Sequence, residues 1–452
     1  MRSAVSKGMT ILVGPTEIAG YYSSLVHGLR ACGCEAIYGV IHSNHFAYGQ
    51  EHPCGHLRRL CLFLWVWGAN RRTNLLIWLF ARLMHQLLGA LYFLFLLPWL
   101  DAAIFGFGHS YLPFNLDLPL LRLCGKVVIV NLGHGSDMRP AYVDGSYLQD
   151  DGSGFIAVER LVAIAKRSRS RVRWIERWAT YFIGAPLSSS VFASRSYVNW
   201  FAIGIPFSGS SDLAAPLPSS AETEARCSSF NLLKIIHAPS KPLVKGSSLI
   251  RQAIHNLQQI GFRIDYQELH GLPNHEVLDA LSRCDLVVDQ LFSDTPMAGL
   301  AVEAAFYGKP SLVAGYGLRQ LNLLLPETYR PPTFTCHPDD FEFTLHRLLT
   351  QPELLRHVGD QAREFVTNAW GPTVVAERYL RLIRRDVPSE WWFDPRQLNY
   401  LHGCGMPESQ LMQSVARVVQ AFGLKGLQLS HRPDLEQSYL DFAHSGLSSS
   451  LD

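Results

Sequence analysis

Two residues that can hold a phosphorylated ligand stand together in the second half of the chain. Lys245 and Gly246 follow the strand-like run 232–236 across a short loop. A lysine in this position can attract a diphosphate as a point charge, and a glycine lets the backbone approach it closely. The alternative for Lys245 taken alone is a solvated loop lysine, so its neighbours decide the interpretation.

The start of a predicted helix provides a second anion-binding element. Gly299, Leu300 and Ala301 open this helix, and their free amides together with the helix dipole favour an anion. Glu303 lies about one turn further on, where a carboxylate can accept hydrogen bonds from sugar or ribose hydroxyls. The simpler alternatives are turn chemistry for the glycine and complementarity to the helix dipole for the acid. Together with Lys245, these residues predict a site for a nucleotide-diphosphate sugar.

Four residues of the first half are candidates for the acceptor side and for catalysis. His134 and Asp137 follow the β-branched strand 126–131, and ligands of open parallel sheets collect at the carboxyl ends of strands. His134 can hydrogen-bond the transferred sugar or position the acceptor, or it is a structural histidine at a turn. Asp137 can act as an acceptor-side carboxylate or cap a turn. Gly20 and Tyr21 form either a loop facing the acceptor and the diphosphate or an ordinary strand-to-helix turn.

Alternating strands and helices must position these residues. In the second half, four strand–helix alternations occur between residues 232 and 313. In the first half, the runs 10–13, 21–31 and 36–41 form a βαβ opening. We therefore predict an α/β protein with two Rossmann-like βαβ domains facing a cleft.

The length of the chain predicts more than one domain. A chain of 452 residues exceeds one ordinary core and suggests two domains of about 200 residues each. We expect an N-terminal, acceptor-side domain over 1–207 and a linker rich in Ser, Pro and Ala over 208–230. The nucleotide-sugar domain is expected over 231–387. A small helical extension follows over 388–452, with an amphipathic helix at 408–422.

Composition excludes several classes of protein. With 48% hydrophobic and 17% charged residues the chain is globular, and a net charge of +2 provides no argument for nucleic acid. The nine cysteines are scattered without paired CxxC units, which predicts a reduced, cytoplasmic protein, and the polar segment 1–9 predicts no signal peptide. Because no DxD triplet near a strand end and no metal-ligand spacing occurs, we expect no metal and no cofactor.

Two segments bear on a membrane partner. The apolar block 75–100 is interrupted by Arg82 and His85, and its clean remainder is shorter than the about 20 residues that a spanning helix needs. We favour a core helix of the first domain, with a helix lying in the membrane surface as the alternative. The predicted helix 159–177 carries six Lys and Arg residues between 166 and 177, which form either a solvated face or a contact with an anionic membrane surface.

Taken in order, four segments resemble the GT-B glycosyltransferases and, within them, the retaining family 4 group. The segments are 18–22, 134–139, 237–246 and 299–310, and the resemblance covers residues 10–385. It implies a nucleotide-diphosphate sugar bound mainly by the second domain, an acceptor bound mainly by the first, and transfer with retention and without a metal. It also implies a position at the cytoplasmic face of a membrane, because many members act there on lipid-linked or cell-surface glycans.

This chain departs from the family at two places. Pro239 and Ser240 stand where members often have an arginine before the lysine. Thr295 stands where they often have a glutamate, so either the adjacent Asp294 binds the donor instead or the donor is handled differently. The predicted function is sugar transfer to a glycan or lipid-linked acceptor in cell-surface polysaccharide or glycolipid synthesis. The alternatives are a nucleotide-sugar epimerase-like enzyme and a catalytically degenerate, membrane-associated binding protein.

Overall fold

The computed structural model describes residues 8–42, 49, 52–71, 73–149, 154–207 and 232–448. The chain divides into two compact units. The first unit comprises 1–138, 167–207 and 370–397, and the second comprises 139–166, 208–369 and 398–452. The linker predicted over 208–230 lies outside the described residues.

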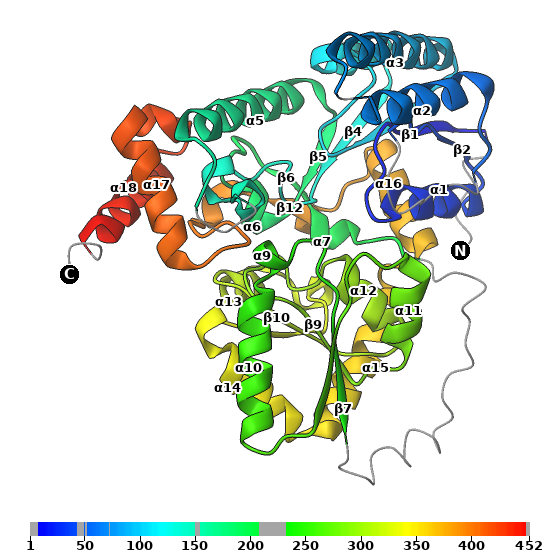
Figure 1. Cartoon of the computed structure of the whole chain (residues 1–452). Coiled ribbons are helices and arrows are strands. Elements are labelled where there is room, and N and C mark those ends of the chain that lie inside the picture. The colour runs from blue at the N-terminus through cyan, green and yellow to red at the C-terminus, as the bar shows by residue number, and fades with distance from the viewer. Residues whose placement is uncertain are drawn as a thin grey trace. The chain divides into compact units, whose positions relative to one another are not determined.

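The described part of the first unit is built on a seven-stranded sheet with the strand order β12-β6-β5-β4-β3-β1-β2 (Figure 1). Neighbouring strands are parallel, except that β12 pairs antiparallel with β6. The strands are β1 Thr10–Gly14, β2 Glu35–Tyr38, β3 Ala102–Gly106, β4 Val127–Leu132, β5 Tyr181–Gly184, β6 Tyr197–Asn199 and β12 Trp392–Phe393. The turns after the parallel strands therefore share one edge of the sheet.

Helices cover this sheet because its central strands are apolar on both faces. Every residue of β4, with the sequence VVIVNL, is buried, as expected for a parallel strand between two layers of helices. The α-helices of the first unit are α1 Tyr21–Ala31, α2 His56–Ala69, α3 Leu75–Leu96, α4 Asp117–Leu123, α6 Pro186–Ser189, α7 Trp200–Ile203 and α16 Pro372–Ile383. Helix α5, Val158–Trp178, begins in the second unit and ends in the first.

Helix α16 shows why the first unit includes a segment from the second half of the chain. Gly28 of α1 lies so close to the backbone of Pro372 that a side chain at position 28 would collide with it. The hydroxyls of Tyr21 and Tyr379 are hydrogen-bonded at 3.0 Å, and Asn131 Nδ2 donates to the Tyr379 hydroxyl at 3.2 Å. Residues 370–387 thus pack with the first unit, although the sequence suggested the second domain.

The described part of the second unit has a five-stranded parallel sheet with the order β11-β10-β9-β7-β8. Its strands are β7 Leu233–His237, β8 Ile264–Glu268, β9 Leu286–Gln290, β10 Ser311–Ala314 and β11 Phe334–Cys336. Figure 1 shows helices on both faces of this sheet. The α-helices of the second unit are α9 Pro242–Lys245, α10 Ser247–Gln259, α11 Asn274–Ser282, α12 Gly299–Phe306, α13 Leu318–Leu324, α14 Phe341–Leu349, α15 Pro352–Asn368, α17 Glu408–Phe422 and α18 Pro433–Ser448, of which α17 and α18 lie away from the sheet. The two Rossmann-like parallel sheets confirm the predicted fold class.

The second unit also takes residues that the sequence assigned to the first domain. Within 139–166, the Tyr142 hydroxyl donates to Leu427 O at 3.0 Å, and Ser414 Oγ donates to Tyr142 O at 2.7 Å. The amide of Gly145 donates to Cys404 O at 2.8 Å. The segment predicted as a helical extension contains α17 and α18, and its residues 392–393 form β12 in the first sheet. Long-range contacts of this kind have no local signal, so the boundaries differ from the expected ones.

The favoured interpretation of the apolar block 75–100 as a core helix is wrong. Helix α3 with the turn that follows it, Leu75–Trp99, is long and apolar enough to cross a membrane, and only 22% of its most apolar window is buried. The buried residues of α3 lie on one stripe at intervals of four, namely Ala81, His85, Gly89 and Phe93. Among the described residues of the first unit, no core covers the rest of the helix surface.

Candidate active site

Lys245 lies at the carboxyl edge of the sheet in the second unit, where it pairs with a buried carboxylate. Its Nζ is 3.1 Å from Oδ1 of Asp289, whose side chain is 1% exposed, while that of Lys245 is 19% exposed. Among the described residues, the second oxygen of Asp289 is buried and has no hydrogen-bond partner. The ammonium group is therefore held at the rim of the sheet with its charge partly balanced and one side open to a ligand.

Glycine at position 246 is required by the turn that holds Lys245. Gly246 has φ of +74°, in the left-handed region, and joins α9 to α10. A Cβ at this position would lie 2.9 Å from Cβ of Leu291. Beneath the turn, the buried His237 has one ring nitrogen 2.8 Å from Val288 O and the other 2.8 Å from Ser247 Oγ. His237 thus joins β7, β9 and α10, and is a structural residue.

The start of α12 is open. Ala298 precedes the helix and provides no side-chain cap, and a Cβ built on Gly299 would meet nothing within 4 Å. The first amides of any helix lack intrahelical acceptors, so those of Gly299, Leu300 and Ala301 are suited to an anion. The glycine itself is not forced by the backbone, because its φ is not positive. Its small size keeps the helix start accessible.

Glu303 lies in the second turn of α12 and is partly buried. Its pKa is raised to about 7, mainly by burial and also by the nearby charge of Asp289, while a hydrogen bond from Asn274 lowers it in part. That bond joins Asn274 Nδ2 to Glu303 Oε1 at 2.9 Å. The carboxyl group therefore exchanges its proton near neutral pH and is poised to accept hydroxyl donors.

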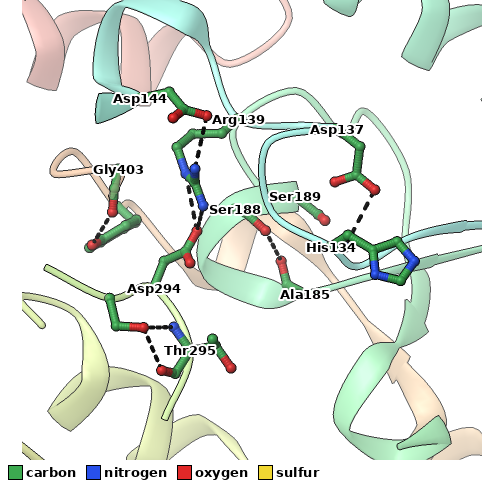
Figure 2. A network of polar contacts seen from close by, with 12 residues as sticks. His134, Asp137, Arg139, Asp144, Ala185, Ser188, Ser189, Asp294, Thr295 and Gly403 are labelled. Carbon is green, nitrogen blue, oxygen red and sulfur yellow. Dashed lines mark hydrogen bonds and ion pairs between the residues drawn. The ribbon is translucent and has the colours of Figure 1, made fainter. Parts of the chain in front are cut away.

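The buried carboxylate of Asp294 is bound by an arginine of the same unit and is not exposed to a nucleotide sugar. Arg139 donates from Nε to Asp294 Oδ2 at 3.1 Å, its Nη2 also contacts this oxygen, and its Nη1 donates to Asp144 Oδ2 at 2.9 Å (Figure 2). All three side chains are buried. One cation holding two buried carboxylates is typical of a structural ion triad, so this geometry does not favour donor binding by Asp294, which stays a prediction.

His134 follows β4 in the first unit, at the carboxyl edge of the sheet. Its Nε2 is 2.8 Å from the hydroxyl of Tyr22, which comes from α1. Burial lowers the pKa of His134 to about 4, so the imidazole is neutral at pH 7. A neutral ring can accept or donate one hydrogen bond but cannot act as a cation or as a protonated acid. The structure leaves His134 as a positioning candidate.

Asp137 is completely buried, which does not fit a carboxylate that meets an acceptor directly. Its Oδ2 lies 3.4 Å from the amide of His134 (Figure 2), and its own carbonyl accepts from Arg171 Nη2 at 2.7 Å. Of the two interpretations of Asp137, the turn-supporting one agrees with this geometry. The catalytic role of Asp137 stays a prediction that its burial does not favour.

The loop at Gly20 and Tyr21 is satisfied by the protein itself. Glu17 accepts from the amides of Tyr22 at 3.2 Å and Ser23 at 2.8 Å, and from the hydroxyl of Tyr38 at 2.8 Å. A buried carboxylate therefore occupies the place where α1 could hold a diphosphate. The buried hydroxyl of Tyr21 donates to Gly204 O at 3.1 Å. Gly20, with φ of +78°, and Tyr21 thus serve the turn and the packing of α1, and their acceptor-side role stays a prediction that these contacts do not favour.

The basic helix α5 is less open than its sequence suggests. The buried Arg169 donates to Phe192 O at 2.8 Å and to Ser194 Oγ at 2.7 Å. Arg171 holds the loop at Asp137, as described above. Lys166, Arg167, Arg173 and Arg177 are exposed. Two of the six cations thus stabilise the first unit, and the predicted charged face is reduced to the other four.

Four functional or supporting residues were missed by sequence reasoning. Asp289, Asn274, Arg139 and Glu17 each pair with a predicted residue or occupy its proposed place. The sequence contains a signal for Asp289, because this residue lies near the end of the buried apolar strand β9, at the edge of a parallel sheet where ligands bind. The other three come from segments distant in sequence or from a turn without a motif. Within the described ranges, no group of three His, Cys, Asp or Glu side chains is placed to hold a metal ion.

Comparison with known proteins gives likenesses of fold. No protein-family model matches the sequence, and no curated protein matches it. The chain is similar to Anabaena HepE in complex with UDP, at 10% identity and a TM-score of 0.43 over 83% of this chain and 100% of that one. It is also similar to a trehalose-6-phosphate synthase, at 13% identity and a TM-score of 0.46 over 84% and 99% of the two chains. A UDP-GlcNAc 2-epimerase from Neisseria meningitidis bound to UDP-GlcNAc matches at 11% identity and a TM-score of 0.37 over 83% and 99%. The function proposed below therefore depends on the residues of this chain.

Proposed function

We propose that the chain is a glycosyltransferase that moves a sugar from a nucleotide-diphosphate donor to a glycan or lipid-linked acceptor. The observation that carries this proposal is the group at the carboxyl edge of the second sheet. It combines the Lys245 ammonium with the open start of α12 and the Glu303 carboxyl group. A cation, free amides and a hydroxyl acceptor are the three groups that a nucleotide-diphosphate sugar needs.

Each group has a distinct part in donor binding. The diphosphate lies against the amides of 299–301 and against Lys245, which gives up part of its pairing with Asp289. Glu303 accepts hydrogen bonds from ribose hydroxyls. When the bond to the sugar breaks, the same positive groups stabilise the charge that collects on the leaving diphosphate. For transfer with retention, we propose that the acceptor hydroxyl forms the new bond to the sugar as the bond to the diphosphate breaks. The departing phosphate takes the proton of this hydroxyl, so no protein carboxylate is needed as a base.

A direct test of this function combines binding with product analysis. Thermal shift with uridine, guanosine and adenosine diphosphates should reveal one base that raises the melting temperature. Incubation with the matching nucleotide sugar should then release the diphosphate and yield a new glycoside or free sugar. An isomerised donor with its diphosphate intact would instead identify an epimerase. Absence of any shift across the panel would contradict both enzymes and favour a degenerate binding protein.

The pKa of Glu303 predicts a pH dependence of donor binding. Ribose hydroxyls favour the ionised carboxylate, so affinity for a nucleotide sugar should rise as the pH increases through about 7. The Glu303→Gln variant should lose this dependence. Titration calorimetry with a nucleotide sugar checks this pH dependence. Measurements between about pH 5.5 and about pH 8.5 extend about 1.5 units to each side of the shifted pKa. A nucleotide sugar is preferred to a free diphosphate because its phosphates stay ionised over this range.

The control is Glu276→Gln, which replaces an exposed glutamate of α11 in the same unit. This variant should keep the pH profile of the natural protein. Protonation of Glu303 also affects the free energy of unfolding. Because the folded pKa of Glu303 lies above the usual 4.5, its stabilising contribution is complete below pH 4.5 and is lost as the pH rises through about 7. An unchanged binding profile in Glu303→Gln would contradict the assignment.

A second prediction concerns His134. The His134→Ala variant should lower turnover by about 100-fold, because the imidazole is proposed to position the acceptor. Donor affinity should not change, since the donor groups belong to the second unit. Tyr22→Phe should give a smaller loss, because it removes only the hydrogen bond that orients the ring. Steady-state kinetics with separate donor binding checks this, and equal losses of turnover and donor affinity would contradict it. Since the pKa of His134 is about 4, turnover should not titrate with this residue above pH 5.

A further inference from the structure

Helices α2 and α3 present a large apolar surface on the first unit. The two helices pack closely, since a Cβ at Gly68 would lie 2.9 Å from Cβ of Ala81. Their large apolar side chains that remain exposed are Leu57, Leu60, Phe63, Val66, Leu75, Leu76, Leu79, Phe80, Leu83, Leu87, Leu91, Leu94 and Phe95, and Trp99 follows α3. Soluble monomers rarely expose so many apolar side chains together, so this surface has a partner. We call it the α2–α3 surface.

The opposite side of α3 is attached to the first unit along its length. His85 Nδ1 is 3.0 Å from Cys61 O, and Gln86 Nε2 donates to Tyr111 O at 2.6 Å. A side chain at Gly89 would approach Ile41 within 2.9 Å, and Phe93 is completely buried. A helix fixed on one face over three turns cannot cross a bilayer with lipid around it. It can lie flat with the other face in the lipid.

The charges around the α2–α3 surface are of one sign. Residues 52–100 include no Asp or Glu, five Arg and no Lys. Arg59 and Arg71, near the ends of α2, are exposed. Four of the ten tryptophans of the chain also lie between 52 and 100, and Trp99 is 72% exposed. Arginine and tryptophan beside an apolar stripe are the residues that suit the headgroup region of an anionic membrane.

We propose that the α2–α3 surface docks on an anionic lipid bilayer, with α3 lying in the plane of the interface. The exposed leucines and phenylalanines enter the acyl boundary, while Arg59 and Arg71 meet lipid phosphates. This anchor is separate from helix α5, whose cations partly serve the first unit. It also holds whether or not the chain transfers sugars, because it depends on surface residues of α2 and α3 alone.

The test is co-sedimentation of the full chain with vesicles of phosphatidylcholine, alone or mixed with phosphatidylglycerol. The natural protein should bind the mixed vesicles more tightly, and added salt should weaken binding without abolishing it. Leu83→Glu combined with Phe95→Glu should weaken binding by about 100-fold, since each buried apolar side chain contributes about tenfold or more. Arg59→Glu combined with Arg71→Glu should remove the preference for phosphatidylglycerol.

The matched control is Leu123→Glu, at an 80% exposed leucine of α4 in the same unit. This variant should bind vesicles like the natural protein. Circular dichroism verifies that all variants are folded, which is expected because the changed side chains are exposed. Equal vesicle binding by Leu83→Glu/Phe95→Glu would overturn the proposal. The proposal would also be overturned if the natural protein did not bind vesicles but formed a dimer that the Leu83→Glu/Phe95→Glu variant could not form. A second copy of the chain would then cover the surface. Resistance of bound protein to an alkaline carbonate wash would overturn the in-plane orientation.

Discussion

Replacing Lys245 with methionine is expected to weaken binding of the matching nucleoside diphosphate by about 10- to 100-fold. The change removes the ammonium group at the edge of the second sheet and keeps a similar side-chain volume. Hydrogen bonds between charged groups contribute about 1.5 to 3 kcal/mol, and about 1.4 kcal/mol corresponds to tenfold in affinity. Titration calorimetry at a fixed salt concentration measures the loss.

A second variant separates a ligand-binding role of Lys245 from a structural one. Asp289→Asn removes the carboxylate that balances Lys245 at 3.1 Å, so the ammonium becomes more available and diphosphate affinity should rise by several fold, roughly up to tenfold. A purely structural lysine predicts no such gain. The control Lys241→Met, at an exposed lysine that precedes α9, should leave affinity nearly unchanged. Equal affinity in Lys245→Met and the natural protein would remove the main support for the proposed donor site.

The largest effect on stability is expected at Arg139. The Arg139→Met variant leaves the carboxylates of Asp144 and Asp294 buried without their cation, which should cost about 3 to 5 kcal/mol of the free energy of unfolding. The melting temperature of the second unit should fall by on the order of 10 °C. The triad joins residues 139–144 to Asp294, which is distant in sequence. Calorimetry can follow the two units as separate transitions.

An exposed ion pair of the same unit provides the control for Arg139. Arg283 pairs with Asp279 on the surface of the protein, and Arg283→Met should cost less than about 1 kcal/mol. Replacing both acids with their amides in the Arg139→Met background should recover much of the loss, because the buried charges are then removed together. A loss no larger than that of Arg283→Met would show that the triad contributes little. Diphosphate affinity should be nearly unchanged in the folded Arg139→Met protein, in agreement with a structural role for Asp294.

The donor side of the site was largely predictable, because its elements are local. Strand β9, helix α12 and the loop at Lys245 each have a clear pattern within a few residues, and the open helix start follows from the absence of a capping side chain. Glu303 lies on α12, but its pKa near 7 could not be anticipated from the sequence. That value comes from burial and from the charge of Asp289, which lies on strand β9.

The first-unit candidates were less predictable. Gly20, Tyr21 and Asp137 have the residue types of a ligand loop, yet Glu17, Gly204 and Arg171 already satisfy the groups around them. In the sequence, a polar residue whose hydrogen bonds are made by another part of the chain cannot be distinguished from one that binds a ligand. Asp294 illustrates this most clearly, because Arg139 is 155 residues away from it.

The sequence by itself determined two parallel α/β sheets, the order of their elements and the residues that meet at the carboxyl edge of the second sheet. Hydrophobic periodicity and turn residues act over a few positions, so these features can be predicted from short stretches of sequence. Only the tertiary structure decided the boundaries of the two units, the partners of buried charges and the exposure of α3. Each of these depends on segments joined across long stretches of chain, and the apolar face of α3 is set by which stripe finds a core to cover it.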